Sequence, residues 1–164
     1  MTKESTTAFS DQALRDTHRE LFVRMLGHLG RKEFDSFQAC LCEDVVQEWP
    51  YLPVPNMPSR LVGSLALRTL IEAGTAPFEP YAYDIHTIHP MLDPNALIAE
   101  YSSNSFYHPT QQPYANQYLS IVRFAGGKIC YWREYVNPLI IKEALLDDFN
   151  KPVDGVHNAA DLQR

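Results

Sequence analysis

The sequence predicts an α+β fold in which helices pack on one face of a curved antiparallel sheet. In the first half of the chain, apolar residues recur at spacings of three and four, which indicates amphipathic helices. The second half changes to segments rich in Tyr, Ile, Val and Phe, which are typical of strands. The length of 164 residues fits one domain, and the order of helices before a strand meander places all helices against the same sheet.

The first half contains three predicted helices and one strand. Ser10 is the expected N-cap of the first helix, and Gly30 ends it. Four prolines in residues 50–58 exclude a helix or a central strand there, so we expect an ordered loop of the kind that covers a site. Ser64 caps the third helix and Gly74 ends it. The predicted helices cover residues 11–29, 33–41 and 65–73, and the strand covers 45–49.

The second half reads as four strands followed by a helix. Turns rich in Pro, Asn and Gly separate the segments, and short turns between successive strands give an antiparallel meander. We expect residues 1–10 to be disordered, residues 11–149 to form the domain, and residues 150–164 to be a polar tail. The predicted strands cover residues 81–89, 96–107, 114–124 and 128–137, and the last helix covers 139–149.

Composition narrows the function classes. The net charge is −6, and the basic residues are scattered, which disfavours binding to nucleic acid or to an anionic membrane. The sequence has neither an apolar run of membrane-spanning length nor the apolar core of a signal peptide, so we expect a cytoplasmic protein. Aromatic residues make up 12% of the chain and are the compositional anomaly.

Neither cysteines nor histidines indicate a metal site. Three cysteines without framework spacing predict reduced thiols, and Cys130 is interpreted as a small core residue. Cys40 and Cys42 lack the second pair of a structural zinc site. His86 and His89 are expected on opposite faces of a strand, because their spacing is odd. We therefore expect no metal and no cofactor.

Several local sequences resemble the nuclear transport factor 2-like superfamily, which includes ketosteroid isomerase, SnoaL-type polyketide cyclases, limonene epoxide hydrolase and the phenazine-biosynthesis A/B proteins. The resemblance covers roughly residues 11 to 148 and implies a cone-shaped sheet with three N-terminal helices on its concave face, plus a C-terminal helix. The pocket would lie between sheet and helices, and the outer face would form a homodimer. The matching segments are Glu43–Tyr51, Leu61–Gly63, Tyr114–Tyr118, Gly127–Ile129 and Arg133–Pro138.

Strand alternation predicts which side chains line that pocket, since every second residue faces the same way. On the last strand, Glu134 shares a face with Cys130 and Trp132, while Arg133 and Tyr135 face outward. The same alternation assigns five residues to one cavity: Trp49, Asn116, Tyr118, Trp132 and Glu134.

Glu134 is the leading catalytic candidate. Aromatic walls would desolvate its carboxyl group and raise its pKa, which suits a general acid or base. The resemblance implies the same role, because phenazine A/B proteins carry a proton-donating glutamate at the matching position. Their histidine and serine on the third helix correspond to Leu70 and Gly74, so phenazine chemistry itself is not expected. The alternative is a Glu134 that pairs with an arginine and faces solvent.

The remaining candidates each have a structural alternative. Ketosteroid isomerases place their base where Trp49 stands, so Trp49 is a pocket wall and Glu48 serves as a base only in a shifted register. Tyr118 and Asn116 would orient a carbonyl or else be hydrogen-bonded core residues. Glu100 is either a second carboxyl group or a structural partner. The candidate substrate-binding residues are Trp49, Trp132, Glu100, Glu48, Tyr51 and His18.

These features predict cofactor-independent isomerase, cyclase or dehydratase chemistry. Glu134, Tyr118 and Asn116 would act by general acid–base catalysis on a small hydrophobic molecule that carries a carbonyl group. One alternative is a non-catalytic small-molecule binding protein of the same fold, and another is a subunit whose main role is dimerisation. A carboxyl group with an ordinary pKa at position 134 would favour the binding protein, and a cavity filled by side chains would favour the subunit.

Overall fold

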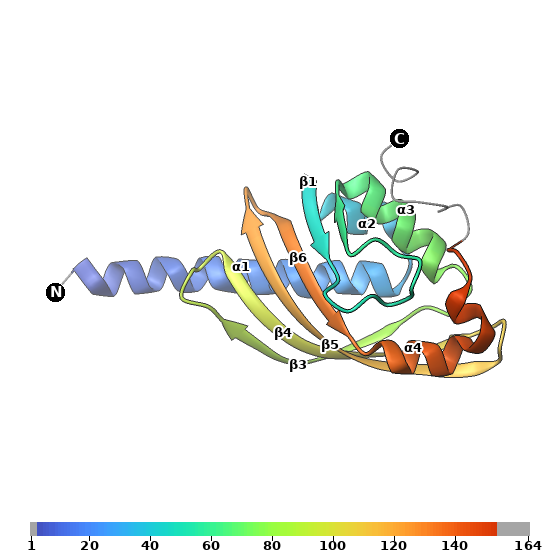
Figure 1. Ribbon diagram of the computed structural model, residues 1–164. Coiled ribbons are helices and arrows are strands. Elements are labelled where there is room, and N and C mark those ends of the chain that lie inside the picture. Colours follow the sequence, from blue (N-terminus) through green and yellow to red (C-terminus); the bar gives the residue numbers. More distant parts are fainter. Residues whose placement is uncertain (1–2, 154–164) are drawn as a thin grey trace.

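A computed structural model describes residues 3–153, with side chains from residue 11 onward, and Figure 1 shows its ribbon. One curved, unclosed sheet has helices on one face, which confirms the predicted α+β class. The strands lie in the order β2-β1-β6-β5-β4-β3. In chain order the elements are α1 (Lys3–Gly30), α2 (Phe34–Ala39), β1 (Leu41–Glu48), β2 (Arg60–Val62), α3 (Ser64–Thr75), β3 (Ala82–Pro90), β4 (Ala96–Tyr107), β5 (Gln112–Ala125), β6 (Lys128–Val136), α4 (Pro138–Leu145) and the 3-10 helix η1 (Leu146–Asn150).

The core lies between the helices and the inner face of the sheet. In Figure 1, α1 runs along the sheet, α2 and α3 lie near β1 and β2, and α4 follows β6 and packs beside β5. The predicted stripe of α1 is buried in this core from Leu21 to Leu29, whereas Leu14 remains 37% exposed. Burial of such a stripe, rather than helix propensity, supplies most of the stability of a helix.

The element boundaries differ from the sequence predictions in places where tertiary contacts decide. Helix α1 begins at Lys3, before the predicted cap Ser10, so part of the segment expected to be disordered is helical. Strand β1 pairs with β6 in parallel, so the sheet is mixed rather than wholly antiparallel. The expected tail is described only as far as Val153; residues 154–164, like residues 1–2, lie outside the described residues.

The end of α1 meets the start of β3 at a close backbone contact. The amide of Tyr81 donates to the carbonyl oxygen of Gly30 at 2.9 Å. A Cβ atom at position 30 would lie 2.5 Å from the carbonyl oxygen of Tyr81 and 3.1 Å from the ring of Tyr83. The glycine that the sequence assigned only as a helix stop therefore also permits β3 and its inward tyrosine to approach α1.

Two β-bulges change the strand alternation. In β6 the register shifts beside Arg123 and Phe124, so Ile129 takes the inward place expected for Cys130. In β3 the register shifts between Ile85 and Thr87, and both His86 and His89 are exposed rather than on opposite faces. A bulge adds one residue to one strand, which reverses the facing of every residue on one side of it.

The cysteines also differ from the prediction of reduced thiols. Cys42 of β1 and Cys130 of β6 form a disulfide with a Cα–Cα distance of 4.9 Å, and Cys40 is buried and free. Cys130 is therefore a cross-link at the bulge and not a core residue. Within residues 3–153, no helix is long and apolar enough to cross a membrane.

The disulfide yields a testable expectation. Because it closes a chain segment with a sequence separation of 88, its loss should lower the free energy of unfolding by about 2–4 kcal/mol. A reductant should therefore lower the Tm of the protein by several degrees. The double variant Cys42→Ser/Cys130→Ser should have the lower Tm from the start and should not respond to reductant, as differential scanning fluorimetry would show. Equal response of both proteins would contradict the cross-link.

Candidate active site

A single carboxyl group lies among the aromatic side chains of the inner sheet face. Glu134 is on β6 between the buried residues Trp132 and Val136, and its own side chain is only partly buried. Desolvation raises the pKa of Glu134 from 4.5 to about 7, although hydrogen bonds from Tyr101 and Trp49 oppose the shift. A carboxyl group with a pKa near 7 can both accept and return a proton at neutral pH.

Each carboxylate oxygen of Glu134 has a different hydrogen-bond donor. The Tyr101 hydroxyl donates to Oε1 at 2.5 Å, and Nε1 of Trp49 lies 3.4 Å from Oε2. The shorter contact fixes Oε1, while Oε2 has only the longer one. Among the described residues, no Lys or Arg forms an ion pair with Glu134, so a positive charge does not offset its desolvation.

The bond from Tyr101 is the end of a row of hydrogen bonds with one direction. Nε1 of Trp132, which can only donate, lies 2.8 Å from Oγ of Ser120, and Ser120 lies 2.8 Å from the Tyr101 hydroxyl. Tyr101 gives its own hydrogen to Glu134, so Ser120 must donate to Tyr101. The Trp132–Ser120–Tyr101–Glu134 row therefore directs every hydrogen toward the carboxylate.

A second hydrogen-bonded cluster lies beside this row. The Tyr118 hydroxyl lies 2.8 Å from Oγ of Ser103 and 3.0 Å from the hydroxyl of Tyr114. Nδ2 of Asn116 donates to the Tyr114 hydroxyl and to the carbonyl oxygen of Asn137, both at 3.0 Å. The rings of Tyr118 and Tyr101 are stacked, with centroids 5.0 Å apart. The stacked rings join the cluster to the row that contacts Glu134.

Five predicted residues are brought together as expected, although their roles stay predictions. Glu134 contacts Trp49 directly and reaches Trp132 through the hydrogen-bond row. Tyr118 stacks on Tyr101, and Asn116 is bonded to the same cluster. However, every polar atom of the Asn116 side chain is already bonded within the protein, which favours its structural alternative.

Four other predicted residues lie away from Glu134, and the local structure explains the position of each. Glu48 precedes the inward Trp49 and so faces outward, where Tyr131 and Arg133 donate to it at 2.7 Å and lower its pKa. Glu100 is exposed and pairs with His89 at 2.8 Å, because the outward set of β4 contains the even-numbered residues. Glu100 is therefore the structural partner that the sequence left as its alternative, and not a second carboxyl group of the site.

Tyr51 and His18 also lie elsewhere. Tyr51 is 61% exposed and packs edge-on against the outward Tyr135. The His18 ring is buried, stacks on Phe124 at 4.2 Å and bonds through Nδ1 to the carbonyl oxygen of Pro94 at 3.0 Å. It is therefore a core histidine with a satisfied partner. The proline-rich loop contributes Val54 and Met57 to the apolar packing instead.

Sequence reasoning missed Tyr101, Ser120 as a member of the row, Tyr83 on β3, and Tyr81, which directly precedes that strand. Tyr83 packs edge-on against Tyr101 and Tyr118, with centroid distances of 6.0 and 6.2 Å, and Tyr81 stacks on Tyr83. The sequence indicates these tyrosines only through the high content of aromatic residues in the second half of the chain. Only the strand register identifies which of them face Glu134.

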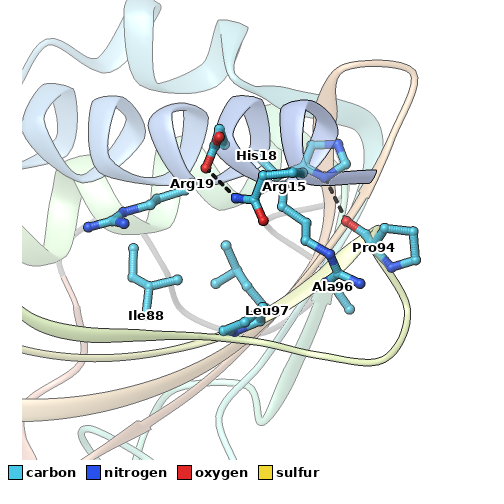
Figure 2. Close-up of a pocket in the computed structure, with 10 residues that line it drawn as sticks. Arg15, His18, Arg19, Ile88, Pro94, Ala96 and Leu97 are labelled. Atoms are coloured by element: carbon cyan, nitrogen blue, oxygen red, sulfur yellow. Dashed lines mark hydrogen bonds between the residues drawn. The ribbon is translucent and has the colours of Figure 1, made fainter. Parts of the chain in front are cut away.

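A separate cavity of about 100 Å³ lies between α1 and the β3–β4 hairpin, and Figure 2 shows its lining. Arg15 donates to the carbonyl oxygen of Met91 at 2.6 Å there, and His18 lies beside Pro94. The cavity shares no residue with the surroundings of Glu134 described above. Within residues 3–153, no group of three or more His, Cys, Asp or Glu residues is arranged to hold a metal ion.

Replacing Tyr101 by phenylalanine should raise the pKa of Glu134 above its wild-type value. The change removes the donor that favours the ionised carboxylate and leaves the aromatic ring in place. NMR titration of protein labelled at glutamate side-chain carbons would follow this group directly. Tyr131→Phe, which removes a hydroxyl from the outward Glu48, is the matched control and should leave the Glu134 titration unchanged.

Comparison with known sequences identifies the family to which a protein with this fold and this site belongs. A model of the SnoaL-like domain family matches residues 22–132, and the chain belongs to this family. The uncharacterized protein YesE of Bacillus subtilis (strain 168) is 28% identical over 130 residues, which are 79% of this chain and 88% of YesE.

Solved structures agree with this assignment. The crystal structure of a candidate isomerase from Bacillus subtilis is similar with a TM-score of 0.76 and 26% identity, over 83% of this chain and 97% of that one. A phenazine biosynthesis-related protein from Pseudomonas aeruginosa has a TM-score of 0.66 and 20% identity, over 83% of this chain and 89% of that protein. The predicted superfamily resemblance is therefore confirmed, and the second match bears on fold alone.

Proposed function

We propose that this protein catalyses proton transfer on a small, largely apolar molecule that carries a carbonyl group, with Glu134 as the general acid–base. The observation that carries the proposal is a carboxyl group with a pKa of about 7, among aromatic rings and without a cationic partner in the described residues. Structural carboxyl groups elsewhere in the chain behave oppositely: partners lower the pKa of Glu33, Glu48 and Asp148. Strongly perturbed groups of this kind concentrate at functional sites.

Ionised Glu134 would remove a proton from the carbon next to the carbonyl group. The C–H bond breaks, an O–H bond forms at the carboxylate, and the electron pair moves to the carbonyl oxygen to give an enolate. Where a C=C bond is conjugated with the enolate, return of the proton to the far carbon of that dienolate completes an isomerisation. In a cyclisation the enolate carbon attacks a second carbonyl carbon of the same molecule, the π bond of that C=O group breaks, and its oxygen takes the proton from Glu134. Both reactions conserve electrons and need no oxidant or reductant.

The surroundings of Glu134 favour an apolar substrate. Its neighbours are the buried aromatic side chains of Trp49, Tyr101 and Trp132, which surround the carboxyl group with apolar surface and carry no charge. Glu134, Tyr83 and Tyr118 keep accessible surface although desolvation is the largest cause of each pKa shift. Groups with both properties are expected to line a recess rather than a convex surface.

The comparisons support the reaction class without naming a substrate. The Bacillus subtilis candidate isomerase shares 26% of its residues with this chain over nearly its full length. Phenazine chemistry is not proposed, because Leu70 is a buried core residue of α3 and Gly74 offers no hydroxyl group. Isomerisation needs only an acid–base group with a pKa near neutral and a hydrogen-bond donor for the enolate oxygen.

The proposal is tested by exchange of carbon-bound hydrogen with solvent. A panel of small apolar ketones and enones is incubated with the protein in D2O, and deuterium uptake next to the carbonyl group is followed by NMR. Glu134→Gln should lose at least about 100-fold in exchange rate, the lower range of a general base. Glu100→Gln, which changes an exposed carboxyl group on the other face, should retain the wild-type rate.

The same panel decides between catalysis and binding. If panel members bind but the wild-type protein exchanges none of them, the protein is a non-catalytic binding protein of the same fold. If Glu134→Gln exchanges as fast as wild type, another group carries the chemistry and the proposal is wrong.

We also propose a homodimer that forms through the outward face of β5 and β6. Leu119 is 36% exposed there beside its strand partner Tyr135, and Ile121 is half-buried on the same face. Such an apolar face on a sheet is typical of association surfaces. Sedimentation equilibrium should give twice the chain mass, and Leu119→Lys should shift the protein toward the monomer.

A further inference from the structure

We infer that Tyr83 is a further catalytic residue, whose hydroxyl group donates the hydrogen bond to the carbonyl oxygen of the substrate. This inference rests on the proposed function and assigns the electrophilic half of the site. General acid–base removal of a carbon-bound proton needs such a donor, because negative charge develops on the carbonyl oxygen. Tyr118 and Asn116 were the sequence candidates for that role, but both are engaged in hydrogen bonds within the protein.

The Tyr83 hydroxyl is available to a ligand. Within residues 3–153 it forms no hydrogen bond, and neither does the hydroxyl of Tyr81. In that part of the chain, Oε1 of Gln47 is the only side-chain polar atom that has neither accessible surface nor a hydrogen-bond partner. Because the Tyr83 hydroxyl has no partner and is not such an atom, it must have accessible surface, although the residue as a whole is only partly exposed. An unpaired donor in a recess is unusual, since buried hydroxyl groups normally find partners.

The position of Tyr83 relative to Glu134 fits the reaction. Its ring meets the stacked rings of Tyr101 and Tyr118 edge-on, and Tyr101 bonds directly to Glu134. After desolvation, the charge of Glu134 is the largest cause that raises the pKa of Tyr83. Tyr81 makes its ring contacts with Phe78, Tyr83 and Tyr114 instead, so of the two tyrosines Tyr83 is the one that packs on the ring bonded to Glu134.

The Tyr83 ring is fixed before a ligand binds. It lies against the backbone of Gly30 at the end of α1, where even a Cβ atom would be only 3.1 Å from the ring. The ring of Tyr81 stacks on the ring of Tyr83, with centroids 5.9 Å apart and an interplanar angle of 14°. A donor held by packing loses little conformational freedom when it binds an oxyanion, which is the property that makes such donors effective.

Binding of 4-nitrophenol tests the inference without knowledge of the substrate. Its ionised oxygen, attached to a planar conjugated ring, is a stable model of an enolate oxygen, and its absorbance reports ionisation. We expect Tyr83→Phe to weaken the affinity for the phenolate form near pH 6 by about tenfold or more, because a charge-assisted hydrogen bond is lost. Tyr135→Phe, the same change on the outward face of the sheet, should bind within twofold of wild type.

The outcomes for Tyr83 and for Glu134 are separable. Affinity for the phenolate form, whose concentration the absorbance gives, should weaken above pH 7 as Glu134 ionises, and Glu134→Gln should remove that part of the pH dependence. Unchanged affinity in Tyr83→Phe, or no binding of 4-nitrophenol to wild type, overturns the assignment of Tyr83. A Tyr83 effect without any pH dependence instead counts against Glu134 and the proposed function. An unchanged Tm in Tyr83→Phe shows that the fold is retained.

Discussion

Glu134→Gln should make the protein more stable at pH 8 than the wild type and should flatten its stability profile between pH 4.5 and 8. The pKa of Glu134 is about 7 in the folded state, against 4.5 for a solvent-exposed glutamate in the unfolded state, so the folded state binds more protons in this window. Stability from this group is therefore complete below pH 4.5 and is lost as pH rises through 7. The shift corresponds to roughly 3 kcal/mol.

Urea unfolding at pH 5 and pH 8 measures this effect. The wild type should lose most of that free energy of unfolding between the two pH values, whereas Glu134→Gln should lose little. Glu33 and Glu48 do not interfere, because their pKa values are lowered and their contributions change only in more acidic solution. Parallel profiles for the two proteins would mean that Glu134 is hydrated and titrates as an ordinary carboxyl group.

Gly30→Ala should destabilise the fold by about 1–3 kcal/mol, the usual cost of overpacking. The new Cβ would lie 2.5 Å from the carbonyl oxygen of Tyr81, and this neighbour is backbone that cannot rotate away. The shift that relieves the contact must also move Tyr83. We therefore expect weaker 4-nitrophenol binding together with a lower urea midpoint.

Gly74→Ala is the matched control. It lies in α3, and its Cβ would have only a Val153 methyl group at 4.0 Å. Alanine is the better helix former by about 1 kcal/mol, so this variant should be as stable as the wild type or more stable. A Gly30→Ala protein that behaved like Gly74→Ala would show that β3 does not need the close approach to α1.

The sequence predicted the site where alternation is simple. Glu134, Trp132 and Trp49 follow from period-two patterning on β6 and at the end of β1. Glu48 shows the sharpness of that rule, because one position before Trp49 the side chain lies on the opposite face and meets Arg133.

Alternation was ambiguous on β4. Both sets of that strand contain apolar residues, since Ile98 faces outward while Leu97 and Ala99 are buried. Glu100 therefore stood as a candidate beside its structural alternative, and Tyr101 was missed. The bulges beside Cys130 and His86 add a second source of error, because pairing across strands determines them and local composition does not.

The availability of the Tyr83 hydroxyl could not be predicted either. It depends on which of several tyrosines find partners, and those partners come from β4, β5 and the chain after β6. A single sequence gives the number of hydroxyl groups but not their pairing. Only the three-dimensional register distinguishes Tyr83 from Tyr114, whose hydroxyl is bonded to two neighbours.

The Trp132–Ser120–Tyr101–Glu134 row also restricts the stereochemistry of the proposed reaction. Reversing the row would leave the Ser120 hydrogen without an acceptor among the described residues, because Trp132 can only donate. Oε1 therefore stays an acceptor, and Oε2 alone carries the travelling proton. One oxygen on one side of a planar enolate removes and returns hydrogen on the same side, so deuterium from solvent should enter a single prochiral face of the product.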